Sequence, residues 1–178
     1  MISRRTVLTA TTAGLALSQF PKVLFASQDV AKSYRIGAAE GEHSFYEGAK
    51  PSKLWLYNGS APGPAIFATK GEILEVIFVN HLDEPTTIHW HGIRNINAMD
   101  GVPGLTQDAV EPGDSFTYRF PLRDAGTFWY HAHNKAWEQV ARGLYGPLIV
   151  NEEGSQSEKG DIVLLVDDWL LDEEEQIH

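Results

Sequence analysis

Four of the seven histidines in this 178-residue chain occur in two His-x-His motifs. The motifs are His89-Trp90-His91 and His131-Ala132-His133. In an extended strand alternate side chains point to the same face, so the two histidines of each motif would lie side by side, with Cα atoms about 7 Å apart. If the two strands are neighbours in the fold, four imidazoles converge on one pocket. Neutral imidazole is a ligand for copper, zinc, iron and nickel, so the pattern predicts a metal site.

The composition of the donor set narrows the choice of metal. All-imidazole donation suits copper and zinc best, and the Irving–Williams order favours copper where copper is available. A three-histidine zinc site of the hydratase kind needs one pair and one further histidine, so a second complete pair supplies one ligand more than such a site uses. A cupin-type iron site needs a carboxylate soon after the His-x-His pair, but no acid follows His91 until Asp100. Two complete pairs suit a cluster of more than one metal ion.

The other three histidines stand alone in the sequence. They are His43, His81 and His178. A single histidine on a strand is more often a satisfied polar residue than a metal ligand, so we assign none of these three to the site.

The chain around the motifs consists of short apolar or alternating runs separated by turn residues such as Asn58-Gly59 and Pro112-Gly113. Strands are expected at residues 33–38, 54–57, 73–80, 86–91, 115–120, 126–131, 144–150 and 162–166. Many short strands punctuated by glycine and proline predict an all-β sandwich or barrel. One helix is expected at residues 134–142, with Trp137, Val140 and Ala141 on one face.

Composition excludes several classes of function. The net charge of −10 and the lack of a basic stripe argue against a nucleic-acid partner. The chain has no cysteine, which excludes disulfides, thiolate zinc sites and iron–sulfur clusters within it. Its length suffices for one domain with a proper core.

The N-terminal residues 1–26 have the features of an export signal. Arg4 and Arg5 precede an apolar stretch that ends at Leu17 and is too short to span a bilayer. The pattern Ser-Arg-Arg-x-x-Leu at residues 3–8 resembles the twin-arginine type, which delivers folded cargo to the bacterial periplasm. An ordinary secretory signal that happens to contain two arginines is the alternative.

Several ordered motifs together resemble the first cupredoxin, or plastocyanin-like, domain of bacterial multicopper oxidases, a family that includes laccases. In chain order the motifs are His89-Trp90-His91-Gly92, residues 97–104, Thr106-Gln107, Glu111-Pro112-Gly113, residues 116–118, residues 125–133 and residues 143–150. The likeness runs from about residue 53 to 150 and continues more loosely to residues 167–169. We therefore expect three segments: the export signal 1–26, a cupredoxin domain 27–152, and a segment 153–178. The last segment would hold a final strand and an acidic tail that begins a connection to absent domains.

This resemblance implies a cupredoxin-like Greek-key β-sandwich that contributes half of a trinuclear copper cluster. His89 would bind the type 2 copper, while His91, His131 and His133 would serve the type 3 pair. In the family this cluster reduces dioxygen to water with electrons from a small molecule or a metal ion. Asp100 matches a catalytic carboxylate near the cluster that assists proton delivery.

The chain also departs from the family pattern. A complete enzyme needs a second group of four histidines and a type 1 copper with a cysteine thiolate, and neither is in these 178 residues. We therefore expect an N-terminal fragment or a truncated product, inactive alone, whose partners are the missing C-terminal cupredoxin domains. A non-catalytic periplasmic module that binds or buffers copper is the alternative. A purely structural role, as in relatives that have lost the copper ligands, conflicts with the retention of all four histidines.

Overall fold

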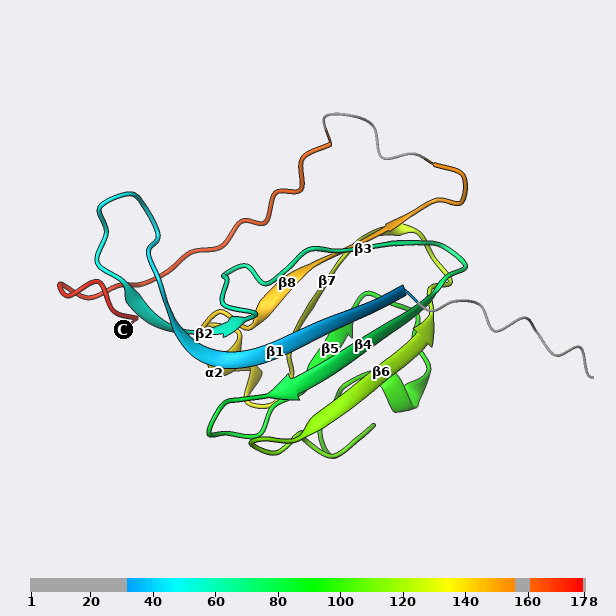
Figure 1. The fold of residues 1–178 in the computed structure, drawn as a ribbon, viewed down its shortest axis with the longest axis horizontal. Helices are drawn as coiled ribbons and strands as arrows, with labels where there is room; N and C mark the ends of the chain where they lie inside the picture. The colour runs from blue at the N-terminus through cyan, green and yellow to red at the C-terminus, as the bar shows by residue number, and fades with distance from the viewer. Residues whose placement is uncertain (1–31, 156–160, 178) are drawn as a thin grey trace, which may run out of the picture.

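The computed structural model describes residues 32–155 and 161–177, so the predicted export signal and His178 lie outside the described part. These residues form two four-stranded sheets that face each other across a shared core (Figure 1). In chain order the strands are β1 (Lys32–His43), β2 (Ser52–Tyr57), β3 (Ile66–Thr69), β4 (Ile73–Asn80), β5 (Ile88–His91), β6 (Ser115–Pro121), β7 (Gly126–Ala132) and β8 (Tyr145–Asn151). The predicted all-β sandwich is confirmed.

The order of strands in each sheet differs from their order along the chain. The first sheet runs β2-β1-β4-β6 and the second runs β3-β8-β7-β5. Most neighbours are antiparallel, but β1 pairs with β4 and β3 pairs with β8 in the parallel sense. The chain passes between the sheets several times, and β5 and β7 become neighbours at one edge of the second sheet.

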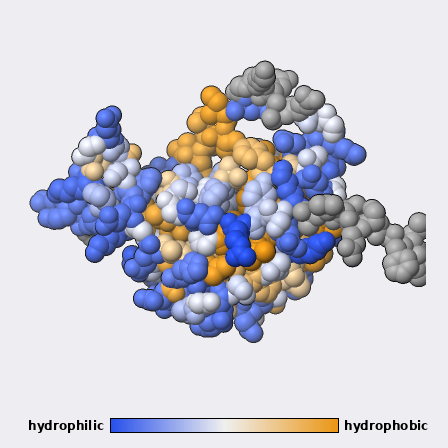
Figure 2. Space-filling model, in the orientation of Figure 1, coloured by the Kyte–Doolittle hydropathy of each residue, from blue (hydrophilic) through white to orange (hydrophobic). Residues whose placement is uncertain are grey.

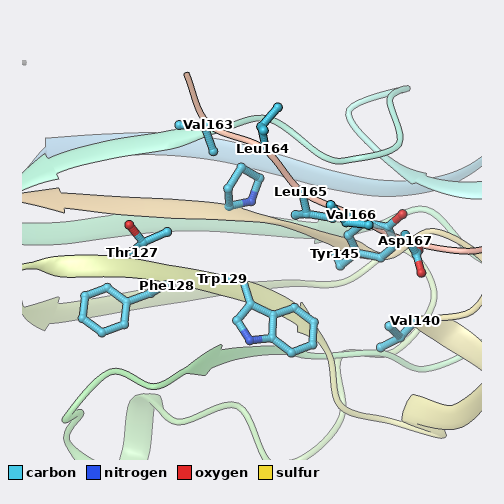
Figure 3. A pocket seen from close by; sticks show the side chains of 11 residues that line it. Thr127, Phe128, Trp129, Val140, Tyr145, Val163, Leu164, Leu165, Val166 and Asp167 are labelled. Carbon is cyan, nitrogen blue, oxygen red and sulfur yellow. The ribbon is translucent and has the colours of Figure 1, made fainter. Parts of the chain in front are cut away.

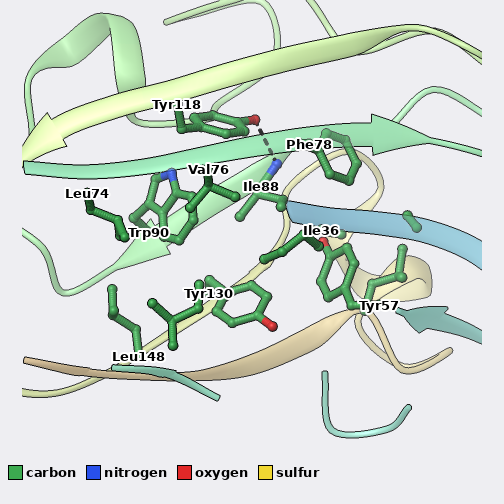
Figure 4. Packing of buried hydrophobic residues seen from close by; sticks show 14 of the residues in the cluster. Ile36, Tyr57, Leu74, Val76, Phe78, Ile88, Trp90, Tyr118, Tyr130 and Leu148 are labelled. Atoms are coloured by element: carbon green, nitrogen blue, oxygen red, sulfur yellow. Dashed lines mark hydrogen bonds between the residues drawn. The ribbon is translucent and has the colours of Figure 1, made fainter. Parts of the chain in front are cut away.

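Alternation of apolar residues builds the core between the sheets. Along β4 every second residue is buried, as expected for a strand with one face inward. Val76 and Tyr118 of the first sheet meet Trp90 and Tyr130 of the second, and all four are fully buried (Figure 4). The backbone N–H of Ile88 donates to the Tyr118 hydroxyl at 2.9 Å, so β6 of one sheet holds the first residue of β5 in the other.

Two strands, β3 and β5, differ from the expectations drawn from the sequence. The strand β3 was not predicted, because its four residues, Ile66–Thr69, give too short a pattern to recognise. The predicted strand 86–91 begins only at Ile88, although Thr86 makes an isolated bridge with Val110.

The predicted helix 134–142 is also shorter and differently oriented. Only α2 (Ala136–Gln139) is α-helical, and a 3₁₀ turn, η2, occupies Asn97–Met99. The apolar face expected from Trp137, Val140 and Ala141 does not pack into the core: the side chain of Trp137 is 79% exposed, whereas Gln139 is buried. The side chain of Gln139 bonds to the segment before β5, and these hydrogen bonds outweigh the apolar pattern.

The strand predicted for residues 162–166 is absent. Residues 161–170 form an irregular segment beside the second sheet, with Ile162, Leu164 and Val166 exposed. Figure 2 shows hydrophobic side chains exposed at the surface at the start of this segment. A strand requires a neighbour for its backbone hydrogen bonds, and no described strand pairs with this one. Among the described residues, no helix is both long and apolar enough to cross a membrane.

The acidic C-terminal residues pack against the start of β2 instead of extending into solvent. The Glu175 carboxylate accepts from the backbone N–H of Lys50 at 2.7 Å, and the Gln176 side chain accepts from that of Lys53 at 3.0 Å. The ring of Trp169 lies 4.9 Å from that of Phe45. The end of the described chain is therefore part of the folded body.

Candidate metal centre

The two histidine motifs lie on the neighbouring strands β5 and β7. These strands are antiparallel, and their register places His89 opposite His131 and His91 opposite Trp129. Trp90 and Ala132, at the middle of each motif, are fully buried in the core, so the histidines face the other side of the sheet. The expectation that the two motifs meet is confirmed.

The four imidazole rings form one cluster. The ring centroid of His89 lies 5.7 Å from His91, 5.4 Å from His131 and 5.1 Å from His133. Ring nitrogen atoms of His89, His91 and His131 lie within 4.8 Å of one another. The fourth ring, His133, stands beside this trio, 6.0 Å from His131.

His131 is the most enclosed of the four. Its Nδ1 lies 2.9 Å from the Ala132 carbonyl oxygen, and because a carbonyl only accepts, Nδ1 carries the proton. The other nitrogen, Nε2, then has a free lone pair and lies 3.3 Å from Nδ1 of His91. Burial, together with the three neighbouring histidines, lowers the pKa of His131 to about 4. The ring is therefore neutral near pH 7, the form that binds metals.

His89 is oriented by the loop that carries Asp100. Its Nδ1 donates to the Asp100 carbonyl oxygen at 2.7 Å, which leaves Nε2 for a metal. The Asp100 carboxylate lies 3.7 Å from the same Nδ1. Gly101 permits this approach: its φ is +77°, and a Cβ there would lie 1.8 Å from the Ile88 carbonyl oxygen.

Trp129 belongs to the site, although the sequence reasoning gave it no role. Its ring stacks on His131 with a centroid distance of 4.2 Å and lies 4.9 Å from His91. A simple signal could have found it, since residues 129, 131 and 133 share one face of an extended segment. Stacking fixes the plane of the His131 ring and covers it from solvent.

The indole of Trp129 also lines a cavity on the outer face of the second sheet. This cavity has a volume of about 400 Å³ and lies between strand residues, including Tyr145, and the segment 163–167 (Figure 3). Its lining is mostly apolar and contains none of the four histidines. The cavity therefore adjoins the cluster through Trp129 but is separate from the nitrogen donors.

The donor set fits copper. All the converging atoms are imidazole nitrogens, which suit copper, and the strand hydrogen bonds fix the spacing of the rings. Two rings, His89 and His131, have their second nitrogen bonded to a backbone carbonyl, the arrangement that orients metal-binding histidines. Four rings spread over 5 to 6 Å offer more nitrogen than a single ion held by three ligands would use.

The fold and the site together define a two-sheet β domain with a cluster of four histidines on the outer face of one sheet. The family model described as "Multicopper oxidase" matches residues 39–155, and the chain belongs to the multicopper oxidase family. The members of this family are oxidoreductases that bind copper.

Relatives of known name agree with this assignment. Laccase-1 of Cryptococcus neoformans var. grubii is 38% identical over 133 residues, which cover 70% of this chain and 21% of that protein. The copper resistance protein A homolog of Pseudomonas syringae pv. tomato is 42% identical over 113 residues, covering 62% and 19% respectively. This chain thus spans about a fifth of the length of these relatives.

Solved structures of similar proteins confirm the cupredoxin-like β-sandwich. Lac15 from a marine microbial metagenome matches with a TM-score of 0.76 and 45% identity over 81% of this chain and 38% of that chain. A multi-copper oxidase from Pseudomonas thermotolerans matches with a TM-score of 0.68 and 46% identity over 71% and 31%.

Proposed function

We propose that this chain supplies half of the histidine ligands of a trinuclear copper cluster in a multicopper oxidase. Bound copper would supply the chemistry that couples one-electron oxidation of a donor, a small molecule or a metal ion, to the reduction of dioxygen to water. The observation that carries this proposal is the convergence of four imidazoles on one sheet face, three of them with nitrogens within 4.8 Å.

The positions of the rings support separate roles for the four histidines. We assign His89 to the type 2 copper and His91, His131 and His133 to the type 3 pair. Nδ1 of His91 and Nε2 of His131 are 3.3 Å apart and face each other, so both suit one pair of neighbouring ions. His89 is held separately, through the Asp100 carbonyl.

Asp100 is assigned to proton delivery. Its carboxylate is 31% exposed and lies 3.7 Å from Nδ1 of His89, so it contacts solvent on one side and a copper ligand on the other. A carboxylate in this place accepts protons from water and passes them toward the cluster.

The proposed oxidase needs groups from outside these 178 residues. The chain contains no cysteine, so a type 1 copper thiolate must come from the C-terminal cupredoxin domains that complete the cluster. We assign residues 27–152 to the first cupredoxin domain and 153–178 to the connection, and we expect the chain alone to oxidise no substrate. Residues 1–26 direct export to the periplasm by the twin-arginine route.

A second candidate function follows from the same geometry. Three nitrogen donors converge within one chain, so copper binding does not require another domain. The chain alone would then act as a non-catalytic copper-binding or copper-buffering module in the periplasm.

Two measurements on the purified chain test these proposals. Copper titration should give stoichiometric uptake that a His91→Ala variant weakens at least tenfold, while His81→Ala, which removes an exposed histidine outside the cluster, leaves uptake unchanged. Oxygen consumption with a phenol or cuprous ion should be absent for the chain alone and appear only with the remaining domains. Equal uptake by all three proteins would refute the copper site, and catalytic oxygen consumption by the chain alone would refute the need for other domains.

A further inference from the structure

The last histidine of the second motif lies outside the strand that carries the motif. β7 ends at Ala132, so His133 is one residue beyond the ladder that fixes His131. Its position is therefore set by the segment that follows it, residues 134–139.

Side chains of this segment bind the residues that lead into β5. The Asn134 amide donates to the Pro85 carbonyl at 2.6 Å, and Lys135 forms an ion pair with Glu84 at 2.9 Å. The ion pair is exposed and contributes little, since surface pairs stabilise by about 0 to 1 kcal/mol. Two hydrogen-bonded contacts remain, that of the half-buried Asn134 and that of Gln139, and only the second is fully buried.

Gln139 is fully buried, and both ends of its amide are bonded to the same short segment. Its Nε2 donates to the Pro85 carbonyl at 3.0 Å, and its Oε1 accepts from the Thr86 hydroxyl at 2.7 Å. A buried amide that loses a partner carries the full cost of its desolvation, so this pair of bonds resists separation. Gln139 therefore fixes the distance between α2 and the segment before β5.

The Thr86 end of this contact is itself held rigidly. The backbone N–H and carbonyl of Thr86 both bond to Val110, at 3.1 and 2.8 Å, and the residue is fully buried. Thr86 lies three residues before His89, and Gln139 lies six residues after His133. The contact joins the two histidine motifs by a route that does not pass through the β5–β7 ladder.

We propose that Gln139 and Thr86 are positioning residues that hold His133 against His89. With this contact in place, the His89–His133 centroid distance of 5.1 Å is maintained. Without it, the segment after β7 keeps the Asn134–Pro85 bond but loses its fully buried anchor, so His133 shifts, while the ladder still holds His89, His91 and His131. The copper part of this inference rests on the proposed function, whereas the positioning part concerns the metal-free protein.

The chain offers a matched pair of variants for the test. Thr86 and Thr87 are adjacent and both fully buried, but the Thr87 hydroxyl has no hydrogen-bond partner among the described residues. Thr86→Val removes the hydroxyl bond to Gln139 and leaves the buried Gln139 Oε1 without this partner, while the Gln139–Pro85 bond stays. Thr87→Val makes the same chemical change where no bond is lost. Thr86→Ser keeps the hydroxyl and serves as the rescue.

The first readout is the ring-nitrogen NMR spectrum of the four histidines in the metal-free 178-residue chain. Thr86→Val should shift or broaden the His133 signals and leave those of His91 and His131 in place, whereas Thr87→Val and Thr86→Ser should match the parent. Unchanged His133 signals in Thr86→Val, or equal changes in all the histidines, would overturn the proposal. If Thr86→Val does not fold, Gln139→Met removes both amide bonds, to Thr86 and to Pro85, and is judged by the same criterion.

The second readout is copper affinity. Thr86→Val should lower it about tenfold, the size expected for removing a group that orients a ligand, and Thr87→Val should leave it unchanged. Equal affinity in the two valine variants would overturn the role of the contact in copper binding. If the parent chain retains no copper, the proposed function fails, but the NMR comparison of metal-free proteins still decides whether Gln139 and Thr86 position His133.

Discussion

Replacing Gly101 with alanine should disturb the histidine cluster through the loop that orients His89. A Cβ at this position would lie 1.8 Å from the Ile88 carbonyl oxygen, whereas ordinary contacts exceed about 3 Å, so the loop must move by more than 1 Å. The Asp100 carbonyl moves with it, and its 2.7 Å hydrogen bond with His89 is stretched or lost.

Three effects contribute to the energy of this change: the backbone conformation, the lost hydrogen bond and the steric clash. The left-handed φ of +77° costs a side chain about 1 to 2 kcal/mol, and the displaced hydrogen bond removes about 1 kcal/mol more. Moving the loop away from the Ile88 carbonyl adds to these costs. Gly101→Ala should therefore lower the free energy of unfolding by about 3 kcal/mol, which for a domain of this size lowers Tm by about 9 °C. Copper affinity should fall about tenfold or more, because His89 loses the group that orients it.

Gly104→Ala is the matched control. Gly104 has almost the same φ, +73°, but its Cβ would meet nothing within 4 Å. Only the backbone cost of about 1 kcal/mol remains, so Tm should fall by about 3 °C and copper affinity should not change. Thermal unfolding followed by circular dichroism, with copper titration of each protein, measures both effects. The same Tm loss and the same copper affinity in the two variants would refute the reasoning.

Three further predictions concern the strands that carry the site. Changing both His131 and His133 to alanine should abolish stoichiometric copper retention and preserve the circular dichroism spectrum, because neither side chain belongs to the hydrophobic core between the sheets; an unfolded spectrum would contradict this. Trp129→Phe should keep copper affinity within about twofold, whereas Trp129→Leu loses a stacking contact of about 0.5 to 1.5 kcal/mol and should bind several-fold more weakly; equal titration curves would exclude a role for the ring. Tyr118→Phe leaves the N–H of Ile88 without its partner and should lower the free energy of unfolding by about 1 to 3 kcal/mol in a urea titration, and a change below 0.5 kcal/mol would argue against this link.

The sequence was most informative where a pattern has a local cause. Strand alternation predicted the bounds of β4 and placed the two histidines of each motif on one face, because side chains along a strand alternate with a period of two. The His-x-His spacing predicted the pairing of imidazoles for the same reason. The family resemblance, based on motifs at compatible spacing, matched the family found by comparison.

Features that depend on distant partners could not be predicted. The pairing of β3 with β8 joins segments about 80 residues apart, and four residues carry no signal for it. Gln139 is buried because Pro85 and Thr86 lie beside it, not because of the pattern around it. In the same way the role of Gly101 depends on the Ile88 carbonyl, which the sequence does not place.

The edge position of β5 has a consequence for protein design. This strand of four residues carries two of the four histidines, yet it is held in place by Tyr118 from the opposite sheet, by the loop at Asp100 and, through Thr86, by Gln139. A peptide or a foreign scaffold given only the His-Trp-His sequence would lack all three supports. Transplanting this centre therefore requires moving the surrounding residues together with the histidines.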